Sequence, residues 1–340
     1  MDILLSTLEA SRIVFTDKQT VGLEKFRPAR PVDGELLVRT EFSLMSTGTE
    51  NIVFNRLYAP GTHWDHWVKY PFYPGYSAVG IVEETGGGSV FKVGDRVASR
   101  SAHRSHGVVA ATRCCLVPND IPSQSAVWFA LAKIAFQGAR AAGHQLGDRV
   151  LIVGAGPVGQ MALRWARAAG AAKIIVIDLA QNRLEMASRG GATVVVPLPI
   201  DQAQEKILAA NDGRSPDIII DSTGNAQVFA ESLRLVSRFG KVVVLGDTGQ
   251  PTDQKLTSDV VVRGVTIVGA HDGHNSEKWN DHTITELFFC LVSSGRFSLE
   301  GLNTHFFQPA DYAEAYKVAN RNRASTMGIL FDWRGHHPAE

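Results

Sequence analysis

Cysteine is scarce in this sequence, since only Cys114, Cys115 and Cys290 occur among its 340 residues. Three thiols cannot supply the ligands of a four-cysteine zinc site, which excludes that kind of structural metal centre. Two adjacent cysteines are poorly suited to a structural disulfide, so the neighbouring pair does not indicate a disulfide framework. The cysteine content therefore favours a reduced, cytoplasmic protein.

Net charge and long apolar runs are also absent. Lys plus Arg and Asp plus Glu both number 34, so the formal net charge is zero. A neutral chain without a basic run offers no electrostatic surface to nucleic acid or to an anionic membrane. No stretch approaches the roughly 18 apolar residues of a membrane-spanning helix, and the first residues lack the pattern of a signal peptide. We therefore expect a soluble protein whose partner is a small molecule.

The length of the chain and its changes in composition predict two domains, because 340 residues seldom fold around a single hydrophobic core. The first 125 residues contain short β-type runs separated by proline and glycine: Arg12–Phe15, Glu35–Thr40 and Ala78–Val82. Near residue 126 the composition becomes rich in alanine, and Ala126–Ala142 carries apolar residues at helical spacing.

Runs of Val and Ile then alternate with helical stretches. The expected strands are Arg149–Val153, Lys173–Asp178, Asp217–Asp221, Lys241–Gly246 and Gly264–Gly269. Continuous apolar strands that alternate with helices predict a parallel sheet covered on both faces, and hence an α/β fold with a doubly wound sheet. Two further helices, Thr283–Ser294 and Ala310–Asn320, precede a final strand at Gly328–Trp333.

A glycine pattern of the dinucleotide-binding type follows the first of these strands. Gly154, Gly156 and Gly159 match G-x-G-x-x-G between the strand Val150–Val153 and an alanine-rich helix. The first glycine permits the tight turn, the second lets a pyrophosphate approach the backbone, and the third lets helix and strand pack closely. The helix N-terminus then offers unpaired N–H groups to the phosphates.

An acidic residue at the end of the next strand indicates which dinucleotide binds. Asp178 follows Gly159 by about 20 residues, the spacing at which a carboxylate accepts hydrogen bonds from the adenosine ribose. The same carboxylate repels a 2′-phosphate. The sequence therefore predicts NAD as the cofactor.

Several segments together resemble the medium-chain dehydrogenase/reductase superfamily, in the right order and over nearly the whole chain: Phe91–Val97, Leu146–Gly159 and Arg238–Gly246. Further segments look like its bacteriochlorophyllide a dehydrogenase-like subgroup: Ser46–Glu50, Pro74–Gly80 and Phe331–Trp333. The resemblance implies a GroES-like, β-rich catalytic domain formed by residues 1–125 and 271–340, interrupted by a Rossmann domain at residues 126–270. It also implies a homodimer that pairs through the edge strand Gly264–Gly269. Besides the three glycines and Asp178, the expected cofactor contacts are Pro157, Val158, Arg183, Thr223, Gly246 and His271.

The chain departs from the zinc-dependent members of that superfamily. Thr47 and Tyr76 stand where those members have a cysteine and a histidine, and the third ligand falls near Ala130. Thr, Tyr and Ala cannot reproduce the Cys, His and carboxylate set that Zn²⁺ requires, so we expect no metal.

Without zinc, hydride transfer from an alcohol needs a side chain that accepts a proton. Lys133 is the first candidate, because it follows Ala130 by one helical turn and interrupts an apolar stretch. A lysine buried in such surroundings has a pKa shifted toward neutrality, although a lysine on the solvent face is an equal alternative. Tyr76 is the second candidate, as a donor of a phenolic hydrogen bond to the substrate oxygen, and ordinary packing in the β-rich domain is the alternative. Thr47 and Glu50 are expected to line the same site, where Glu50 orients Lys133, binds a substrate hydroxyl or has a structural hydrogen-bonding role.

Aromatic residues and histidines supply candidates for substrate contact: Trp64, His66, His103 and His274. Trp64 and His66 would suit stacking on a sugar or a flat ring, while core packing is the competing interpretation. His271 and His274 follow the sixth strand, where the backbone of this fold usually runs past the nicotinamide, so they are candidates for cofactor or substrate contact. A position in an ordinary loop without such a contact is an equal alternative.

Three functions remain open at this point. The first is NAD-dependent oxidation of a secondary alcohol in a sugar, polyol or ring-bearing substrate. The second is NAD(P)H-dependent reduction of enones or quinones, which zinc-free members of the superfamily often perform. The third is a catalytically inert NAD-binding protein, which the loss of zinc ligands permits.

Overall fold

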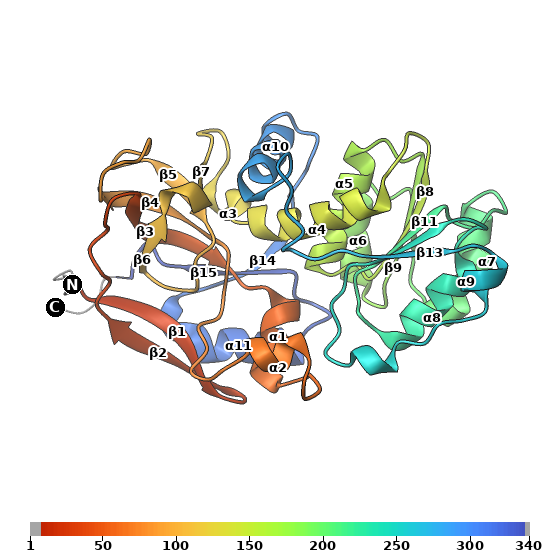
Figure 1. Cartoon of the computed structure of the whole chain (residues 1–340), viewed down its shortest axis with the longest axis horizontal. Coiled ribbons are helices and arrows are strands. Elements are labelled where there is room, and N and C mark those ends of the chain that lie inside the picture. Colours follow the sequence, from red (N-terminus) through yellow and green to blue (C-terminus); the bar gives the residue numbers. More distant parts are fainter. Residues whose placement is uncertain (1–7, 337–340) are drawn as a thin grey trace.

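The computed structural model describes residues 8–336 and has two lobes, which helix α4 (Phe129–Ala142) joins near the middle of the long axis (Figure 1). One lobe contains a six-stranded sheet, and the other contains a seven-stranded sheet and a separate two-stranded hairpin. None of the helices within residues 8–336 is both long and apolar enough to cross a membrane.

The six-stranded sheet is entirely parallel. Its order is β10 (Val194–Val196), β9 (Lys173–Ile177), β8 (Arg149–Val153), β11 (Ile218–Asp221), β12 (Lys241–Val244) and β13 (Thr266–Gly269). The predicted α/β class with a doubly wound sheet is confirmed. Strand order reverses between β8 and β11, and in such sheets the ligand crevice lies outside the carboxyl ends of the strands at this point.

Helices cover both faces of this sheet because successive strand residues point to opposite sides. Val150 and Ile152 of β8 pack on the side of α4, α5 (Pro157–Ala168) and α6 (Gln181–Gly190). Leu151 and Val153 pack on the side of α7 (Ile200–Ala210) and α8 (Ala226–Leu235). The short α9 (Asp259–Val262) precedes the edge strand β13.

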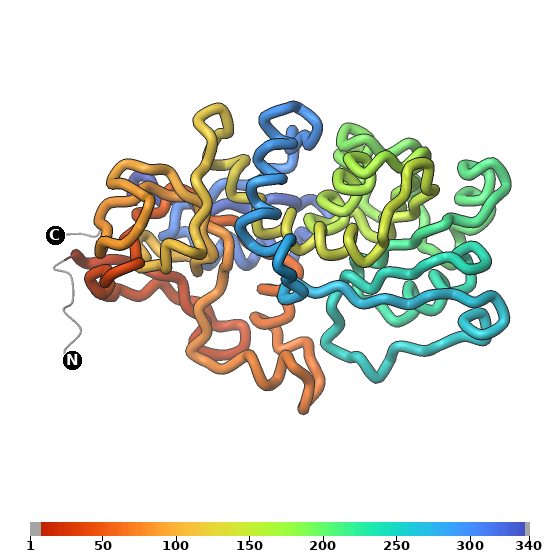
Figure 2. The backbone as a smooth tube through the Cα atoms, turned by 45° about the horizontal axis from the view of Figure 1, so that its top comes forward, coloured from red at the N-terminus to blue at the C-terminus, as the bar shows by residue number. Residues whose placement is uncertain are grey.

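The seven-stranded sheet combines both ends of the chain. It contains β14 (Asn303–Phe307), β15 (Gly328–Asp332), β3 (Glu35–Leu44), β4 (Ala78–Thr85), β5 (Arg96–Ser99) and β7 (Cys114–Leu116), and β6 (His106–Ala110) also pairs with β3. β15 runs antiparallel to β3 and parallel to β14, so the blue C-terminal segment lies among the red and orange strands in Figure 2. The separate hairpin consists of β1 (Ala10–Asp17) and β2 (Thr20–Phe26).

Helices and short turns complete the β-rich lobe. They are α1 (Thr47–Asn55), α2 (His63–Trp67), α3 (Ser123–Ala126), α10 (Asp281–Ser293), α11 (Tyr312–Arg321) and the 3₁₀ turns η1 (Ala111–Arg113) and η3 (Pro309–Asp311), while η2 (Pro251–Asp253) follows β12. α10 packs beside α4 at the junction of the lobes (Figure 1).

Two sequence predictions differ locally from the structure. The helix expected from Ala126 is divided, because α3 ends at Ala126 and α4 begins at Phe129. The side chain of Trp128 fills the break, where it is fully buried and donates its Nε1–H to Oδ1 of Asn303 at 2.7 Å. The sequence of residues 55–73 has no clear periodicity and predicts a loop, but this segment contains the single-turn helix α2. The proposed domain boundaries at residues 125 and 270 stay a prediction.

Candidate active site

The glycine turn joins β8 to α5. Gly154 has a φ of 88°, a conformation that favours glycine, and a Cβ on Gly159 would lie 1.9 Å from the carbonyl oxygen of Gly154. A Cβ on Gly156 would meet only the Arg183 guanidinium, at 3.8 Å, so the backbone remains approachable there. Pro157 occupies the first turn of α5, and the N–H groups that follow have no partners within the helix. The turn is thus built to receive an anion.

A cavity of about 540 Å³ lies beside this turn, at the carboxyl ends of β8, β9 and β11. Gly154, Asp178, Arg183 and Thr223 line it. One carboxylate oxygen of Asp178 accepts the N–H of Ala155 at 2.7 Å, and the other accepts the N–H of Ala180 at 2.8 Å. These bonds fix the Asp178 carboxylate at the rim, between the glycine turn and the start of α6.

Arg183 ties the cavity to the β-rich lobe. Its guanidinium donates to the carbonyl oxygens of Arg323 and Thr326, which belong to the segment between α11 and β15. Burial lowers the pKa of Arg183. Because Ala324 also lines the cavity, both lobes contribute to its wall.

Two other expected cofactor residues, Val158 and Gly246, are not among those that line the cavity. Gly246 packs against the backbone of residues 222–224, closer than any side chain would permit. Val158 is partly buried against the core cluster that includes α5.

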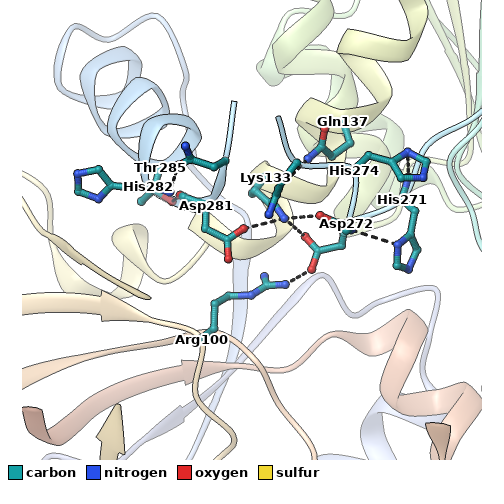
Figure 3. A network of polar contacts seen from close by, with 12 residues as sticks. Arg100, Lys133, Gln137, His271, Asp272, His274, Asp281, His282 and Thr285 are labelled. Atoms are coloured by element: carbon teal, nitrogen blue, oxygen red, sulfur yellow. Dashed lines mark hydrogen bonds and ion pairs between the residues drawn. The ribbon is translucent and has the colours of Figure 1, made fainter. Parts of the chain in front are cut away.

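Lys133 lies in a network of ion pairs between the lobes (Figure 3). It is 3% exposed, and its Nζ lies 2.8 Å from Oδ1 of Asp272 and 2.7 Å from Oδ1 of Asp281, besides contacting the carbonyl oxygen of Asp272. Arg100, which follows β5, pairs with the second oxygen of Asp272. Burial acts to raise the pKa of Asp281, but its hydrogen bond to Lys133 and the nearby positive charges outweigh burial and lower it.

Tyr76 adjoins this network through Arg100, whose guanidinium carbon lies 4.9 Å from the centre of the tyrosine ring. The Tyr76 hydroxyl donates to Oγ of Ser46 at 2.5 Å, beside the start of α1, where Thr47 is the first residue. Burial raises the pKa of Tyr76, so the phenol is protonated at neutral pH. This arrangement presents a hydroxyl group that can transfer a proton.

Glu50 belongs to a separate buried network and does not contact Lys133. Its carboxylate accepts the N–H of Ser46 at 2.8 Å and the hydroxyl of Tyr316 at 2.6 Å, and it pairs with Nε2 of His103 at 3.2 Å. Burial, together with the Glu50 charge, raises the pKa of Tyr316 well above its usual value. Glu50 therefore has a structural hydrogen-bonding role at the start of α1 and does not orient Lys133.

The structure separates the residues expected to contact substrate. His103 is 0% and Trp64 is 4% exposed, so both side chains are core residues in this conformation. His66 is exposed and its Nδ1 bonds to the carbonyl oxygen of Thr62 at 2.8 Å. His271 and His274 are exposed on the segment after β13, beside Asp272 (Figure 3).

Sequence reasoning missed Arg100, Asp272 and Asp281. A buried lysine requires an acidic partner, so the apolar residues around Lys133 in the sequence indicated that such a partner exists if Lys133 is buried. The sequence could not identify the partners, because the two acids lie more than a hundred residues along the chain from Lys133.

The residues that the resemblance places at zinc-ligand positions are of types that do not bind Zn²⁺. Thr47 and Tyr76 offer hydroxyl groups and Ala130 offers a methyl group. Elsewhere in the described part of the chain, residues 8–336, His, Cys, Asp and Glu side chains form no group of three that could hold a metal.

Two family profiles match the chain. The profile described as "Alcohol dehydrogenase GroES-like domain" matches residues 33–120, and the one described as "Zinc-binding dehydrogenase" matches residues 157–314. The first match confirms the GroES-like assignment of the β-rich lobe.

Individual proteins are similar to between about half and nearly all of this chain. L-threonine 3-dehydrogenase from Bacillus licheniformis is 26% identical over 55% of this chain and 53% of that protein, so the chain spans about half of this relative. The enzyme of the same name from Anaeromyxobacter sp. strain K is 26% identical over 80% of this chain and 86% of that protein. The fold is similar to that of an alcohol dehydrogenase solved with NADH, from Escherichia coli CFT073, with a TM-score of 0.81 and 19% identity over 96% of this chain and 99% of that chain.

Proposed function

The chain belongs to the alcohol dehydrogenase-like, medium-chain dehydrogenase/reductase superfamily, and on this premise we propose that it is a zinc-independent, NAD-dependent oxidoreductase. It interconverts a secondary alcohol and a carbonyl compound. The observation that carries the proposal is the cavity at the switch point of the parallel sheet, with the glycine turn at one end and Asp178 at its rim.

The residues that line the cavity support NAD as its ligand. The turn from Gly154 to Gly159 and the start of α5 would hold the pyrophosphate, and Asp178 would accept hydrogen bonds from the adenosine ribose. Arg183 and Thr223 line the same cavity. Bound NAD would supply the acceptor for a hydride. The Asp178 carboxylate disfavours a 2′-phosphate, and the NADH in the similar Escherichia coli structure is consistent with a nicotinamide cofactor.

Tyr76 is the residue that we propose for proton transfer. The resemblance aligns Tyr76 with a zinc ligand of related enzymes, and its hydroxyl is held by Ser46. Lys133 was the first candidate from the sequence, but its Nζ is engaged by the carboxylates of Asp272 and Asp281. Lys133 is instead a positioning residue, which fixes Asp272 next to Arg100 and Tyr76.

The proposed substrate is an alcohol, because the carbon that carries the hydroxyl group can donate a hydride to NAD. The names of the two L-threonine 3-dehydrogenases support an alcohol substrate, and we propose a secondary alcohol in a sugar, polyol or ring-bearing molecule. Exposed His66, His271 and His274 are the candidates for contact with it.

The deciding experiment compares cofactor binding, turnover and metal content in one preparation. We expect tighter binding of NAD than of NADP by calorimetry, oxidation of members of an alcohol panel, and activity that survives chelators without stoichiometric zinc. Better turnover with NADP would contradict the role of Asp178, and one zinc per chain that is lost together with activity would contradict zinc independence.

The same assays separate the two alternatives. NADH oxidation by quinones or enones, without activity on alcohols, would identify a reductase. Cofactor binding without turnover on either panel would identify a non-catalytic NAD-binding protein.

A further inference from the structure

A guanidinium group lies over the ring of the residue that we propose for proton transfer. The Cζ atom of Arg100, the residue that follows β5, is 4.9 Å from the centre of the Tyr76 ring. The Arg100 side chain is 12% exposed, so water screens its charge only in part. A cation over the face of an aromatic ring is attracted to the ring electrons. This attraction grows when the phenol ionises, because the ring and its oxygen then share a full negative charge.

The position of Arg100 is fixed by the segment that follows β13. One terminal nitrogen, Nη2, pairs with Oδ2 of Asp272, and Oδ1 of the same carboxylate lies 2.8 Å from Nζ of Lys133 (Figure 3). The other terminal nitrogen of Arg100, Nη1, is buried and has no hydrogen-bond partner within residues 8–336. A buried polar group without a partner is rare in folded proteins. Arg100 therefore keeps a donor for a negative charge that develops beside it.

Two charged side chains act on the Tyr76 hydroxyl group, and they act in opposite directions. Burial raises the pKa of Tyr76, and the hydrogen bond with Ser46 and the charge of Arg100 act against burial. The Thr49 hydroxyl also lowers the pKa, while the Asp272 carboxylate raises it. The lowering by Arg100 is larger than the raising by Asp272, so the ion pair as a whole favours the phenolate.

The other charged groups around this part of the site have partners of their own. Lys133 binds Asp281 as well as Asp272, and Glu50 pairs with His103 near the start of α1. Since Asp281 balances the charge of Lys133, the balance between Arg100 and Asp272 determines the local charge beside the Tyr76 ring.

This balance matters for the proposed oxidation. The alcohol carbon transfers a hydride to NAD and the hydroxyl proton passes to the Tyr76 oxygen, so the phenolate is the reactive form. We propose that Arg100 is a positioning residue for this step and that its guanidinium stabilises the negative charge of the Tyr76 phenolate. This inference rests on the proposed function and adds to it a source of positive charge that is not a metal ion. An opposite charge at this distance changes the phenol–phenolate equilibrium by about tenfold.

The test compares Arg100→Met with Asp272→Asn, two variants of the full chain that break the same ion pair but change the local charge in opposite directions. Arg100→Met removes the cation, so the phenolate fraction of Tyr76 at a fixed alkaline pH should fall about tenfold, and the rate of alcohol oxidation with it. Asp272→Asn removes the anion, so the phenolate fraction at the same pH should increase. The near-ultraviolet absorbance of tyrosinate measures this fraction, after subtraction of the same variant with Tyr76→Phe. Circular dichroism checks that each variant is folded at that pH.

Two further variants serve as controls. Arg39→Met removes an arginine from an ion pair with Glu83 in the same sheet as β5, and Arg39 is not among the groups that act on Tyr76. Its phenolate fraction should equal that of the unmodified protein. Arg100→Lys keeps a cation and should recover part of the loss seen in Arg100→Met.

Opposite changes of the phenolate fraction in the two main variants support the proposal, and any other combination overturns it. Changes of the same sign, in particular, would indicate that the ion pair has only a structural role. If Arg100→Met does not fold, Asp272→Asn decides alone: an increased fraction supports the proposal, and an unchanged or reduced fraction overturns it. Opposite changes without turnover of any alcohol would support the effect of Arg100 on Tyr76 and contradict the proposed function instead.

Discussion

Tyr76 combines burial of its hydroxyl group with a short hydrogen bond. Burial raises its pKa, and a short hydrogen bond of 2.5 Å fixes its hydroxyl on Ser46. A protonated phenol is a donor to a carbonyl oxygen, which suits the reduction direction. Oxidation of an alcohol needs the phenolate, whose population grows as the pH rises. Because the pKa of Tyr76 is raised, the protonated phenol needed for reduction is present at neutral pH, and the rate of alcohol oxidation should increase as the pH rises.

Tyr76→Phe should lower kcat about 10²-fold while the dissociation constant of NAD stays unchanged, because only the proton-transfer group is removed. In the unmodified protein, the rate of alcohol oxidation should increase with pH across the neutral and alkaline range, by up to about tenfold per unit. Steady-state kinetics from pH 6 to 10 would measure both effects. A Phe variant with full activity and the same pH slope would remove Tyr76 from the mechanism.

At this scale the sequence predicted individual residues better than their partners. Gly154, Gly159 and Asp178 could be identified because a local motif determines their positions. For Lys133 the sequence left burial and solvent exposure as equal alternatives, because its ion pairs with Asp272 and Asp281 depend on how distant segments meet. Trp64 and His103 illustrate the same limit, since aromatic and imidazole side chains suit a core as well as a pocket.

At the scale of elements, one lysine connects three parts of the chain. Lys133 projects from α4 and holds Asp272 after β13 and Asp281 at the start of α10. The chain passes between the lobes at α4 and again between β13 and α10, and both connections therefore meet at the Lys133 ammonium group. An ion pair that is largely removed from water is costly to break from one side, because the remaining charge stays without its partner.

Asp281→Asn should reduce the free energy of unfolding by about 1–2 kcal/mol at neutral pH, because it removes one of two carboxylates from Lys133. The folded-state pKa of Asp281 is lowered, so its contribution is present at neutral pH and is lost as the pH falls through that value. The difference between variant and unmodified protein should thus shrink below about pH 4. Denaturant unfolding at several pH values measures it.

The control is Glu286→Gln on the same helix. Glu286 pairs with His282 at 3.1 Å, but both side chains are more than half exposed, so little stability should change. Equal effects of the two variants at neutral pH would contradict a special role of the Lys133 network.

Elements of regular length were predicted well and short ones were not. Runs such as Lys173–Ile177 combine β-branched residues with burial on both faces, and this combination is specific to central parallel strands. α2 and α3 contain five and four residues, too few for a helical period to be recognised. The break at Trp128 arises from long-range packing against Asn303, which local pattern does not contain.

At the scale of the whole molecule, the outer edge of β13 is flanked by exposed apolar side chains. Phe239, Leu256, Val261 and Val262 are 73%, 70%, 87% and 74% exposed, and they lie before or beside this edge strand. An open strand edge bordered by apolar surface favours pairing with a second copy. We therefore propose that two chains associate through this edge.

Val261→Glu should convert the expected dimer to a monomer, because a charge would be buried at the apolar contact. Sedimentation at micromolar concentration should give about twice the chain mass of 36.9 kDa for the unmodified protein and the single mass for the variant. Leu146→Glu is the control, since Leu146 is 88% exposed elsewhere on the same lobe and its replacement should leave the dimer intact. A monomeric unmodified protein would contradict the proposal.

The last strand also determines when the β-rich lobe can be completed. β15 lies inside its sheet, between β14 and β3, although it comes from residues 328–332. During synthesis on the ribosome, the flank of β3 that β15 will cover must wait until residues 328–332 have emerged, whereas every strand of the parallel sheet is available once residue 269 has been made. The sheet that contains β3 is therefore completed after the parallel sheet, although β3 is translated earlier, and the uncovered edge of β3 is a place for chaperones or for premature aggregation to act.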